Sequence, residues 1–496
     1  MHNIFAAIDL GSNSFHMIVG QHEAGQIIIL DKLREMVRLA SGLDEDKNIT
    51  PEMMDKCLNC LSRFGERIRH LDADVVRIVG TNSLRQARNS REFMRKAEDL
   101  LGHPIEIISG IEEARLIYTG VAHNVDFDDG KRLVVDIGGG STEIIIGERF
   151  QPILMESLYM GCVNMTRLFF SNGNITQKKI DKALFHAMNE LEPHTKAYRK
   201  LGWEYAIGAS GTARAIRKIS IEEGLAEQGI TKESLDAILK KIASVETIDK
   251  ISLAGLKTER KPVVLGGVIV LKSIFDTFSI ERMTISEGAL REGILYDLVG
   301  RDENNDSRTD SVENFAQRFV VDHDHSLRVK ETAVELFKQV NGQWFKKSEQ
   351  TEARKHLEWA ARLHEVGLCI AHSQYYTHGA YMVGQADLTG FSRQDQSLLS
   401  ALIQTHRRTL HLEPFNDFDS NNKRIGKRLA ILLRLAVLMN RSRAEELPEL
   451  PIIKVDKKNI QLTFSNNWLD NHSLTYSDLE SEKSYLEKVG FKLEFE

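Results

Sequence analysis

The chain of 496 residues has little of what secreted or membrane-spanning proteins need. It has four cysteines, and only Cys57 and Cys60 stand close together, so we expect reduced thiols and no zinc site. The longest apolar run, residues 263–271, contains two glycines and is too short to cross a bilayer. The N-terminal stretch MHNIFAAIDLGSNS has no basic flank and predicts a strand, not a signal peptide. These absences favour a cytoplasmic protein.

The chain also lacks an excess of positive charge. Its formal net charge is −6, with 27% charged and 42% hydrophobic residues, as in globular proteins. Such a chain has no overall attraction to polyanions, so binding of a polyanion would need a local basic patch. Nucleic acid is therefore not an expected partner.

The first 300 residues contain short strands that alternate with helices. The predicted strands lie at 5–9, 15–22, 26–39, 75–80 and 104–109, and the same order starts again at 132. Thr50 is the predicted cap of the first helix, with Pro51 at its first position. Two halves of one βββαβα order predict two similar α/β domains with mixed sheets.

The remainder of the chain has a different hydrophobic pattern. The polar stretch RDENNDSRTDS, 301–311, predicts a linker, and helical periodicity follows it. From 451 onward two strand-like stretches and a charged segment predict a small α+β unit. The predicted domains are 1–125, 126–305, 306–450 and 451–496.

Two segments share one plan: AAIDLGSNSFHMIVG at 6–20 and VVDIGGGSTEIIIG at 134–147. Each is a strand, a glycine turn with hydroxyls and a second strand, and each first strand ends in an aspartate, Asp9 or Asp136. Glycine lets backbone N–H groups converge on an anion. Facing each other, the turns would grip a phosphate chain, and carboxylates beside phosphate favour Mg²⁺. The alternative is two ordinary hairpins.

The double motif resembles the actin-like phosphotransferase superfamily. With EMVRLASGL, GTNSLRQARN, IISGIEEARLIYTGV, MGCV, GASGTARAI and EGALREGILYDL, the chain is similar to the exopolyphosphatase and guanosine pentaphosphate phosphohydrolase family. The resemblance continues through LHEVGLCIAHS and covers almost the whole chain. It implies two actin-like (ribonuclease H-like) α/β domains, an all-α HD-like domain and a small C-terminal α+β domain.

The resemblance also implies hydrolysis of phosphoanhydride bonds. Our main interpretation is a Mg²⁺-dependent exopolyphosphatase that releases terminal phosphate from polyphosphate. The alternative is a guanosine pentaphosphate 5′-phosphohydrolase, and a distant alternative is a non-catalytic actin-like nucleotide-binding module. The family implies a homodimer, and a peripheral contact with the inner membrane is a further expectation.

Particular residues acquire roles through this resemblance. Glu113 is the expected base that directs water, although Glu112 and Glu113 are also typical acids of a helix N-terminus. The expected metal ligands are Asp9, Asp136 and Glu143. The expected phosphate-binding residues are Ser12, Asn13, Ser14, Arg85, Gly138, Gly139, Gly140, Ser141, Thr142, Gly208, Ser210 and Gly211.

The helical region adds two further expectations. It resembles the HD superfamily, but His364-Glu365 stands where a metal-binding His-Asp pair is expected, so we expect a scaffold without its own chemistry. The basic segment NNKRIGKRLAILLRL predicts a polyphosphate track, made by Lys423, Arg424, Lys427 and Arg428. A solvated amphipathic helix is the alternative. The track is one reason for preferring polyphosphate as substrate.

Overall fold

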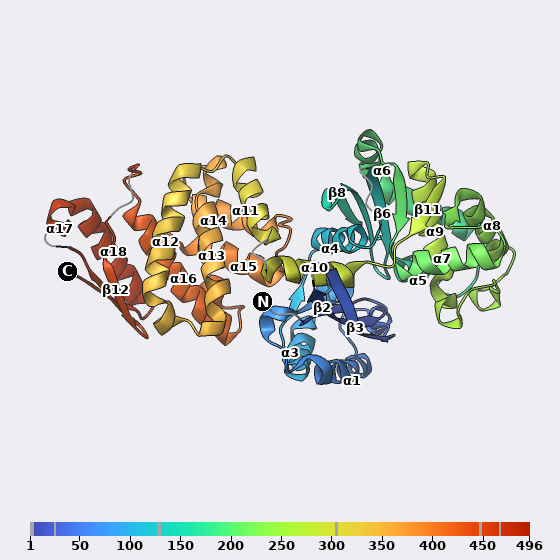
Figure 1. Cartoon of the computed structure of the whole chain (residues 1–496), viewed down its shortest axis with the longest axis horizontal. Helices are drawn as coiled ribbons and strands as arrows, with labels where there is room; N and C mark the ends of the chain where they lie inside the picture. Colours follow the sequence, from blue (N-terminus) through green and yellow to red (C-terminus); the bar gives the residue numbers. More distant parts are fainter. Residues whose placement is uncertain (1–3, 24–25, 126–129, 303–305, 446–448, 466–467) are drawn as a thin grey trace. The chain divides into compact units, whose positions relative to one another are not determined.

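The computed structural model describes residues 4–23, 26–125, 130–302, 306–445, 449–465 and 468–496. The chain divides into two compact units, residues 1–306 and 307–496 (Figure 1). The first unit contains both glycine turns, and the second contains the helical region that resembles the HD superfamily.

The first half of the first unit is built on a five-stranded mixed sheet. The strands lie in the order β3-β2-β1-β4-β5: β1 (Ile4–Leu10), β2 (Phe15–Glu23), β3 (Gln26–Glu35), β4 (Val76–Gly80) and β5 (Ile105–Ile107). β1, β2 and β3 are antiparallel, whereas β4 runs parallel to β1 and β5 to β4. Residues 24–25, between the predicted strands 15–22 and 26–39, lie outside the described residues.

Helices complete this half. They are α1 (Pro51–Ile68), α2 (Asn82–Gln86), α3 (Ser90–Leu101) and α4 (Gly110–Ala122), with a short 3₁₀ turn at Leu39–Gly42. The predicted cap of α1 is confirmed, because the Thr50 hydroxyl accepts a hydrogen bond from the Met53 N–H and Pro51 is the first helical residue. α1 and α3 pack side by side beside the first sheet (Figure 1).

The second half repeats the plan on a six-stranded sheet. Its order is β10-β11-β9-β6-β7-β8: β6 (Lys131–Ile137), β7 (Thr142–Glu148), β8 (Gln151–Leu158), β9 (Tyr205–Gly208), β10 (Ile230–Thr231) and β11 (Arg282–Ile285). The helices are α5 (Cys162–Phe170), α6 (Gln177–Leu201), α7 (Gly211–Glu222), α8 (Lys232–Ala243) and α9 (Val264–Phe278). The predicted mixed sheet is confirmed, since β6, β7 and β8 are antiparallel and β9 runs parallel to β6.

Helix α10 (Leu290–Asp302) returns to the first half of the unit. It follows β11 of the second sheet but packs against α4, β1 and β2, and its Ile294 and Leu295 belong to the hydrophobic cluster of the first sheet. The predicted second domain, 126–305, includes this helix. The structure differs because the apolar face of α10 is buried on the earlier strands.

The predicted linker at 301–311 is largely helical. α10 continues to Asp302, and α11 (Ser307–Arg318) begins five residues later, while 303–305 lie outside the described residues. The polar composition of this stretch predicts a linker, but α11 begins within it and buries Val312, Phe315 and Ala316 in the core of the second unit. Composition alone therefore overestimates the length of the connection.

The second unit combines helices with a three-stranded sheet. Its longer helices are α11, α12 (His323–Trp344), α13 (Gln350–Leu363), α14 (Tyr375–Gln385), α15 (Arg393–Thr405), α16 (Ser420–Met439) and α18 (Ser473–Lys488). Its strands are β12 (Ile452–Asp456), β13 (Asn459–Thr463) and β14 (Lys492–Phe495), and the short α17 (Trp468–Asn471) precedes α18. Helix and sheet residues share one hydrophobic cluster, so the predicted domains 306–450 and 451–496 have a common core.

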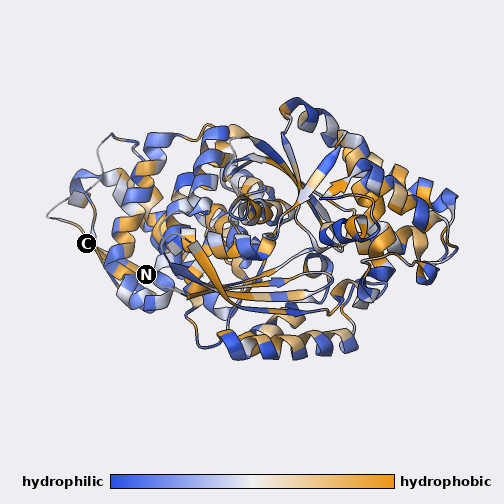
Figure 2. Cartoon of the chain, turned by 45° about the vertical axis from the view of Figure 1, so that its right-hand side comes forward, coloured by the Kyte–Doolittle hydropathy of each residue, from blue (hydrophilic) through white to orange (hydrophobic). Residues whose placement is uncertain are grey.

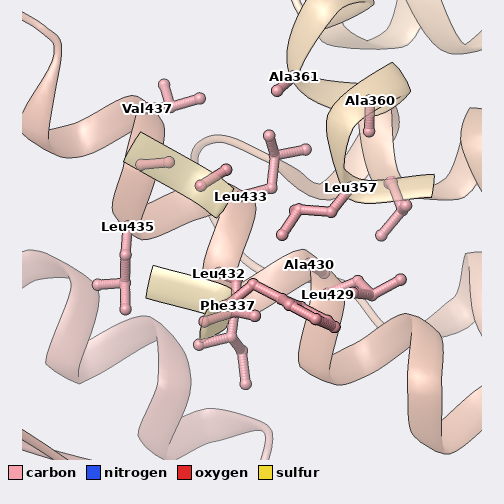
Figure 3. Close-up of a cluster of buried hydrophobic side chains, with 14 of the residues drawn as sticks. Phe337, Leu357, Ala360, Ala361, Leu429, Ala430, Leu432, Leu433, Leu435 and Val437 are labelled. Atoms are coloured by element: carbon pink, nitrogen blue, oxygen red, sulfur yellow. The ribbon is translucent and has the colours of Figure 1, made fainter. Parts of the chain in front are cut away.

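The centre of that core is formed by α12, α13 and α16. Phe337, Leu357, Leu429 and Leu432 face one another there (Figure 3). Apolar and polar residues alternate along most helices, as expected for amphipathic helices covering a core (Figure 2). Of the helices that the structure describes, none combines the length and hydrophobicity that a membrane crossing requires.

Candidate functional site

The two glycine turns meet in one cleft of the first unit. Gly11 to Ser14 and Gly138 to Ser141 both line a cavity of about 520 Å³. A methyl group built on Gly139 would lie 3.3 Å from Cβ of Ser12, so the turns approach each other closely. The predicted arrangement of two turns facing across a cleft is therefore present.

The carbonyl groups of each turn accept hydrogen bonds from a neighbouring segment of the chain. In the first turn, the N–H groups of Arg38 and Ala40 donate to the carbonyls of Asn13 and Ser12, both at 2.9 Å. Because C=O and N–H of a trans peptide point in opposite directions, the N–H groups of Asn13 and Ser14 point away from residues 38–40. The segment EMVRLASGL thus holds these two donors toward the cleft.

The second turn is held in the same way by the N-terminus of α5. Cys162 N–H donates to Gly138 at 3.0 Å and Val163 N–H donates to Gly139 at 2.9 Å. The Asn164 side chain donates to the Gly140 carbonyl at 2.8 Å. The N–H groups that follow these three carbonyls point away from α5, which makes a concave set of donors that suits a phosphate. The segment MGCV has this supporting role.

Four carboxylates stand together beside the turns. Asp9, Glu113, Asp136 and Glu143 all line the cavity. Burial, followed by repulsion from Glu113, raises the pKa of Asp9 to about 8 and that of Asp136 to about 7. Burial and repulsion from Glu113 and Asp136 raise the pKa of Glu143 well above its usual value. Such a cluster is electrostatically costly without a compensating cation.

Glu112 and Glu113, at the start of α4, have different surroundings. Glu112 is fully buried and pairs with Arg115 at 2.7 Å and Arg77 at 3.4 Å, inside a structural ion-pair network. Glu113 lines the cleft, and its carboxylate lies 3.1 Å from the guanidinium of Arg85. Burial raises the pKa of Glu113, although Arg85 opposes the shift. Both glutamates are buried, because α4 packs against β7, β8 and α10.

Cations also gather in the same cavity. Seven basic side chains line it: Lys32, Arg34, Arg214, Lys218, Lys257, Arg260 and Arg291. Burial lowers the pKa of the Arg34 guanidinium. The positive charges of Arg260, Arg291 and Arg214 lower this pKa further. These arginines come from β3, α7, the 258–263 turn and α10, so no single motif contains all four, although Arg214 lies in GASGTARAI and Arg291 in EGALREGILYDL. Our sequence analysis did not identify them.

Not every predicted phosphate-binding residue reaches the cavity. Ser210 and Gly211 at the start of α7 line it together with the residues of both turns. The Thr142 hydroxyl instead donates to the Met160 carbonyl at 2.5 Å, and Gly208 is packed against Ala213 and Ile285. Arg85 donates to the Ile108 carbonyl at 2.8 Å and pairs with Glu113. These three therefore support the site from outside its lining.

The predicted polyphosphate track lies on α16 of the second unit. Three of its four cations make hydrogen bonds within that unit. Arg424 pairs with Glu349 at 2.7 Å, and Arg428 donates to the Trp344 carbonyl. Arg424 donates to the same carbonyl at 3.0 Å, so both guanidinium groups hold the C-terminal end of α12. Lys423 donates to Asn416 at 2.7 Å. These contacts favour a structural role for the two arginines over a track.

The His364-Glu365 pair belongs to a buried cluster. Ligand atoms of His325, His364 and Glu365 lie within 4.8 Å of one another. Burial lowers the pKa of His364 to about 4. Arg443 contacts the Glu365 carboxylate at 2.5 Å and Asp322 at 3.2 Å, so a guanidinium stands beside this acid. A scaffold without its own chemistry stays a prediction.

Two family models and several full-length relatives match this chain. The model of the Ppx/GppA phosphatase family matches residues 18–302, and that of Ppx/GppA phosphatase domain III matches residues 307–483. A relative from Aeromonas hydrophila, named guanosine-5′-triphosphate,3′-diphosphate pyrophosphatase, is 38% identical over 493 residues, covering 99% of both chains. A Vibrio cholerae relative of the same name is 38% identical, covering 99% of this chain and 98% of its own.

Solved structures give the same fold. An exopolyphosphatase from Cytophaga hutchinsonii has a TM-score of 0.54 and 24% identity over 60% of this chain and 98% of its own. The Aquifex aeolicus Ppx/GppA enzyme has a TM-score of 0.51 and 24% identity over 59% and 98%. The prediction of two actin-like α/β domains and a C-terminal helical domain is confirmed. The chain therefore belongs to the Ppx/GppA phosphatase family and is a hydrolase that acts on phosphoanhydride bonds.

Proposed function

We propose that this chain removes the terminal 5′-phosphate of guanosine pentaphosphate, leaving guanosine tetraphosphate and orthophosphate. The observation that carries this proposal is the relationship over the full length to several proteins that bear this activity in their names, at 37–38% identity. The preference for polyphosphate stated above is not supported by these relatives. The exopolyphosphatase structure is 24% identical and supports the fold alone.

The charges of the cleft agree with a substrate that carries two separate phosphate groups. The carboxylates and the two turns suit the reacting 5′ end, where backbone donors surround the terminal phosphate. The cluster of Arg34, Arg214, Arg260 and Arg291 in the same cavity suits a second, non-reacting anion such as the 3′-diphosphate. A cavity of about 520 Å³ is in the range of small-molecule sites.

In this proposal Glu113 is the base. Its raised pKa suits a group that takes a proton from water while the water oxygen attacks the terminal phosphorus. The bond from that phosphorus to the bridging oxygen breaks, and the bridging oxygen leaves with the nucleotide. Arg85 holds the Glu113 carboxylate in place at 3.1 Å.

The carboxylate cluster fits Mg²⁺. Asp9, Asp136 and Glu143 offer hard oxygen ligands, and in the described part of the chain Oδ1 of Asp9 is buried without a hydrogen-bond partner. We propose that these three residues hold the ion, directly or through water. When bound, Mg²⁺ supplies charge neutralisation on the phosphate oxygens.

Phosphate release from two substrates tests the proposed function. With Mg²⁺ present, kcat/KM for guanosine pentaphosphate is expected to exceed that for long-chain polyphosphate, with one phosphate released per guanosine tetraphosphate formed. A larger kcat/KM for polyphosphate would overturn the proposal and restore the exopolyphosphatase interpretation.

The arginine cluster gives a sharper comparison. Arg34→Ala should raise KM for guanosine pentaphosphate by about 10-fold, because an ionic hydrogen bond is lost. It should change KM for tripolyphosphate little, because that substrate has no second phosphate group. Arg167→Ala removes an exposed arginine of α5 in the same unit and serves as the matched control. Equal effects of Arg34→Ala on both substrates would contradict a 3′-diphosphate contact.

A further inference from the structure

His16 stands in the cleft between a guanidinium group and a hydroxyl group. It lies on β2 opposite Asp9 of β1 and lines the cavity. Nη1 of Arg291 lies 3.1 Å from its Nδ1, and its Nε2 lies 2.8 Å from Oγ of Ser14. The imidazole thus connects the first helical turn of α10 to the first glycine turn.

The direction of these hydrogen bonds follows from the chemistry of arginine. A guanidinium group has donors only, so Nδ1 of His16 must accept and cannot carry a proton. The single imidazole proton then resides on Nε2, which donates to Ser14 Oγ. Because Ser14 Oγ accepts there, its own proton must point toward another acceptor.

The equivalent serine of the second turn has the opposite arrangement. Asp136 faces Glu143 across β6 and β7, just as Asp9 faces His16, so Glu143 takes the place of the histidine. Ser141 hydrogen-bonds the carboxyl group of Glu143 rather than a histidine. The Ser141 hydroxyl is therefore engaged by a side chain of its own hairpin that can accept a proton, whereas Ser14 receives a proton from His16 and has its own available in the cleft.

We propose that His16, oriented by Arg291, is a positioning residue that makes the Ser14 hydroxyl a hydrogen-bond donor to a phosphate oxygen of the substrate. The inference rests on the proposed function, because it needs a phosphate group between the two turns. It gives the two similar turns different tasks: the first presents a hydroxyl donor to the substrate, and the second keeps its hydroxyl on a carboxylate.

Two substitutions of His16 separate this role from simple packing. The amide of glutamine reaches the position of Nε2 and can donate to Ser14, whereas asparagine reaches only the position of Nδ1. We expect His16→Asn to lower kcat/KM by about 10-fold, as for loss of one hydrogen bond. His16→Gln should recover most of the loss. Thermal unfolding of each variant reports any effect on stability separately.

A double-mutant cycle with Ser14→Ala then tests the connection. Ser14→Ala should itself lower kcat/KM by about 100-fold, as for removal of one donor to the reacting group. In that background His16→Asn and His16→Gln should cause no further loss, since His16 acts through the serine. Multiplicative losses, equal losses for asparagine and glutamine, or full activity of Ser14→Ala would overturn the proposal.

The cycle also distinguishes this inference from the proposed function. It is run on whichever phosphoanhydride substrate the unmodified chain hydrolyses best, so a preference for polyphosphate would refute the proposed substrate and leave the cycle intact. A second readout needs no variant: ¹⁵N NMR of the histidine-labelled protein should show His16 as the Nε2–H tautomer. A proton on Nδ1 would overturn the proposal whatever the activities.

Discussion

The substitution Gly161→Ala should displace the second glycine turn, because Gly161 packs against the backbone of that turn. Gly161 precedes α5 and has φ of −95°, which any residue adopts, so alanine meets no backbone strain there. A methyl group at this position would instead lie 2.3 Å from the Gly139 carbonyl oxygen and 2.5 Å from the Gly140 nitrogen. The conflict is with backbone atoms of the turn, which cannot rotate away as a side chain can.

The size of the effect follows from these distances. Real Cβ atoms hardly ever approach another heavy atom closer than 3.0 Å, so the turn and α5 must separate by about 0.7 Å. Overpacking of this kind costs about 1–3 kcal/mol of folding free energy. The shift lengthens the hydrogen bonds from Cys162 and Val163 and moves the donors of the turn, and a displacement of about 1 Å at a reacting group can cost about 100-fold in rate.

Two measurements check this reasoning. Denaturant unfolding should show the loss of stability, and steady-state phosphate release should show a kcat lowered by about 10- to 100-fold. Gly342→Ala in α12 is the matched control, since its methyl group meets no atom within 4 Å and should stabilise the helix by about 0.5–1 kcal/mol. Unchanged kcat and unchanged stability of Gly161→Ala would refute the argument that α5 supports the turn.

Three further predictions follow from the charged groups. Glu113→Gln should lower kcat by about 10²–10⁴-fold while KM changes little, and near-normal turnover would exclude Glu113 as the base. Asp136→Asn should raise the Mg²⁺ concentration needed for half-maximal rate, and an unchanged Mg²⁺ titration would contradict a ligand role. Burial disfavours the charged form of His356, but the Asp395 carboxylate at 3.2 Å outweighs this and raises the pKa of His356. The resulting stabilisation is present below the unfolded pKa of about 6.5 and disappears as pH rises through the folded pKa. His356→Gln should therefore reduce the free energy of unfolding more at pH 6 than at pH 9, and equal losses would contradict the ion pair.

The repeated hairpins show what local sequence can predict. Strand pairing in β1–β2 and β6–β7 depends on neighbouring residues and on turn chemistry, so both hairpins could be predicted from the spacing of their strands and glycine turns. The choice of Glu113 over Glu112 needed the family resemblance. Periodicity alone does not say that α4 is enclosed on both sides, with Glu112 in an ion-pair network and Glu113 in the cleft.

The return of α10 and the roles of Arg85 and Thr142 depend on contacts between distant segments. α10 lies on strands more than 200 residues earlier in the chain, and its own sequence pattern does not say which sheet it covers. Thr142 belongs to the motif by position, but its hydroxyl is used by the Met160 carbonyl. A motif therefore predicts which backbone turn forms a site better than it predicts where each side chain points.

The same limit explains why the sequence motifs did not separate the two candidate substrates. The shared motifs build the reacting end of the cleft, where both candidate substrates present the same terminal phosphate, so they carry no information about the rest of the molecule. What would distinguish the substrates is the arginine cluster in the same cavity, assembled from β3, α7, the 258–263 turn and α10. The basic helix α16 was more conspicuous because its cations are contiguous, yet Arg424 and Arg428 are used to hold the end of α12. Contiguity makes a basic patch visible in a sequence, whereas convergence in a cavity is what allows cations to recognise a ligand.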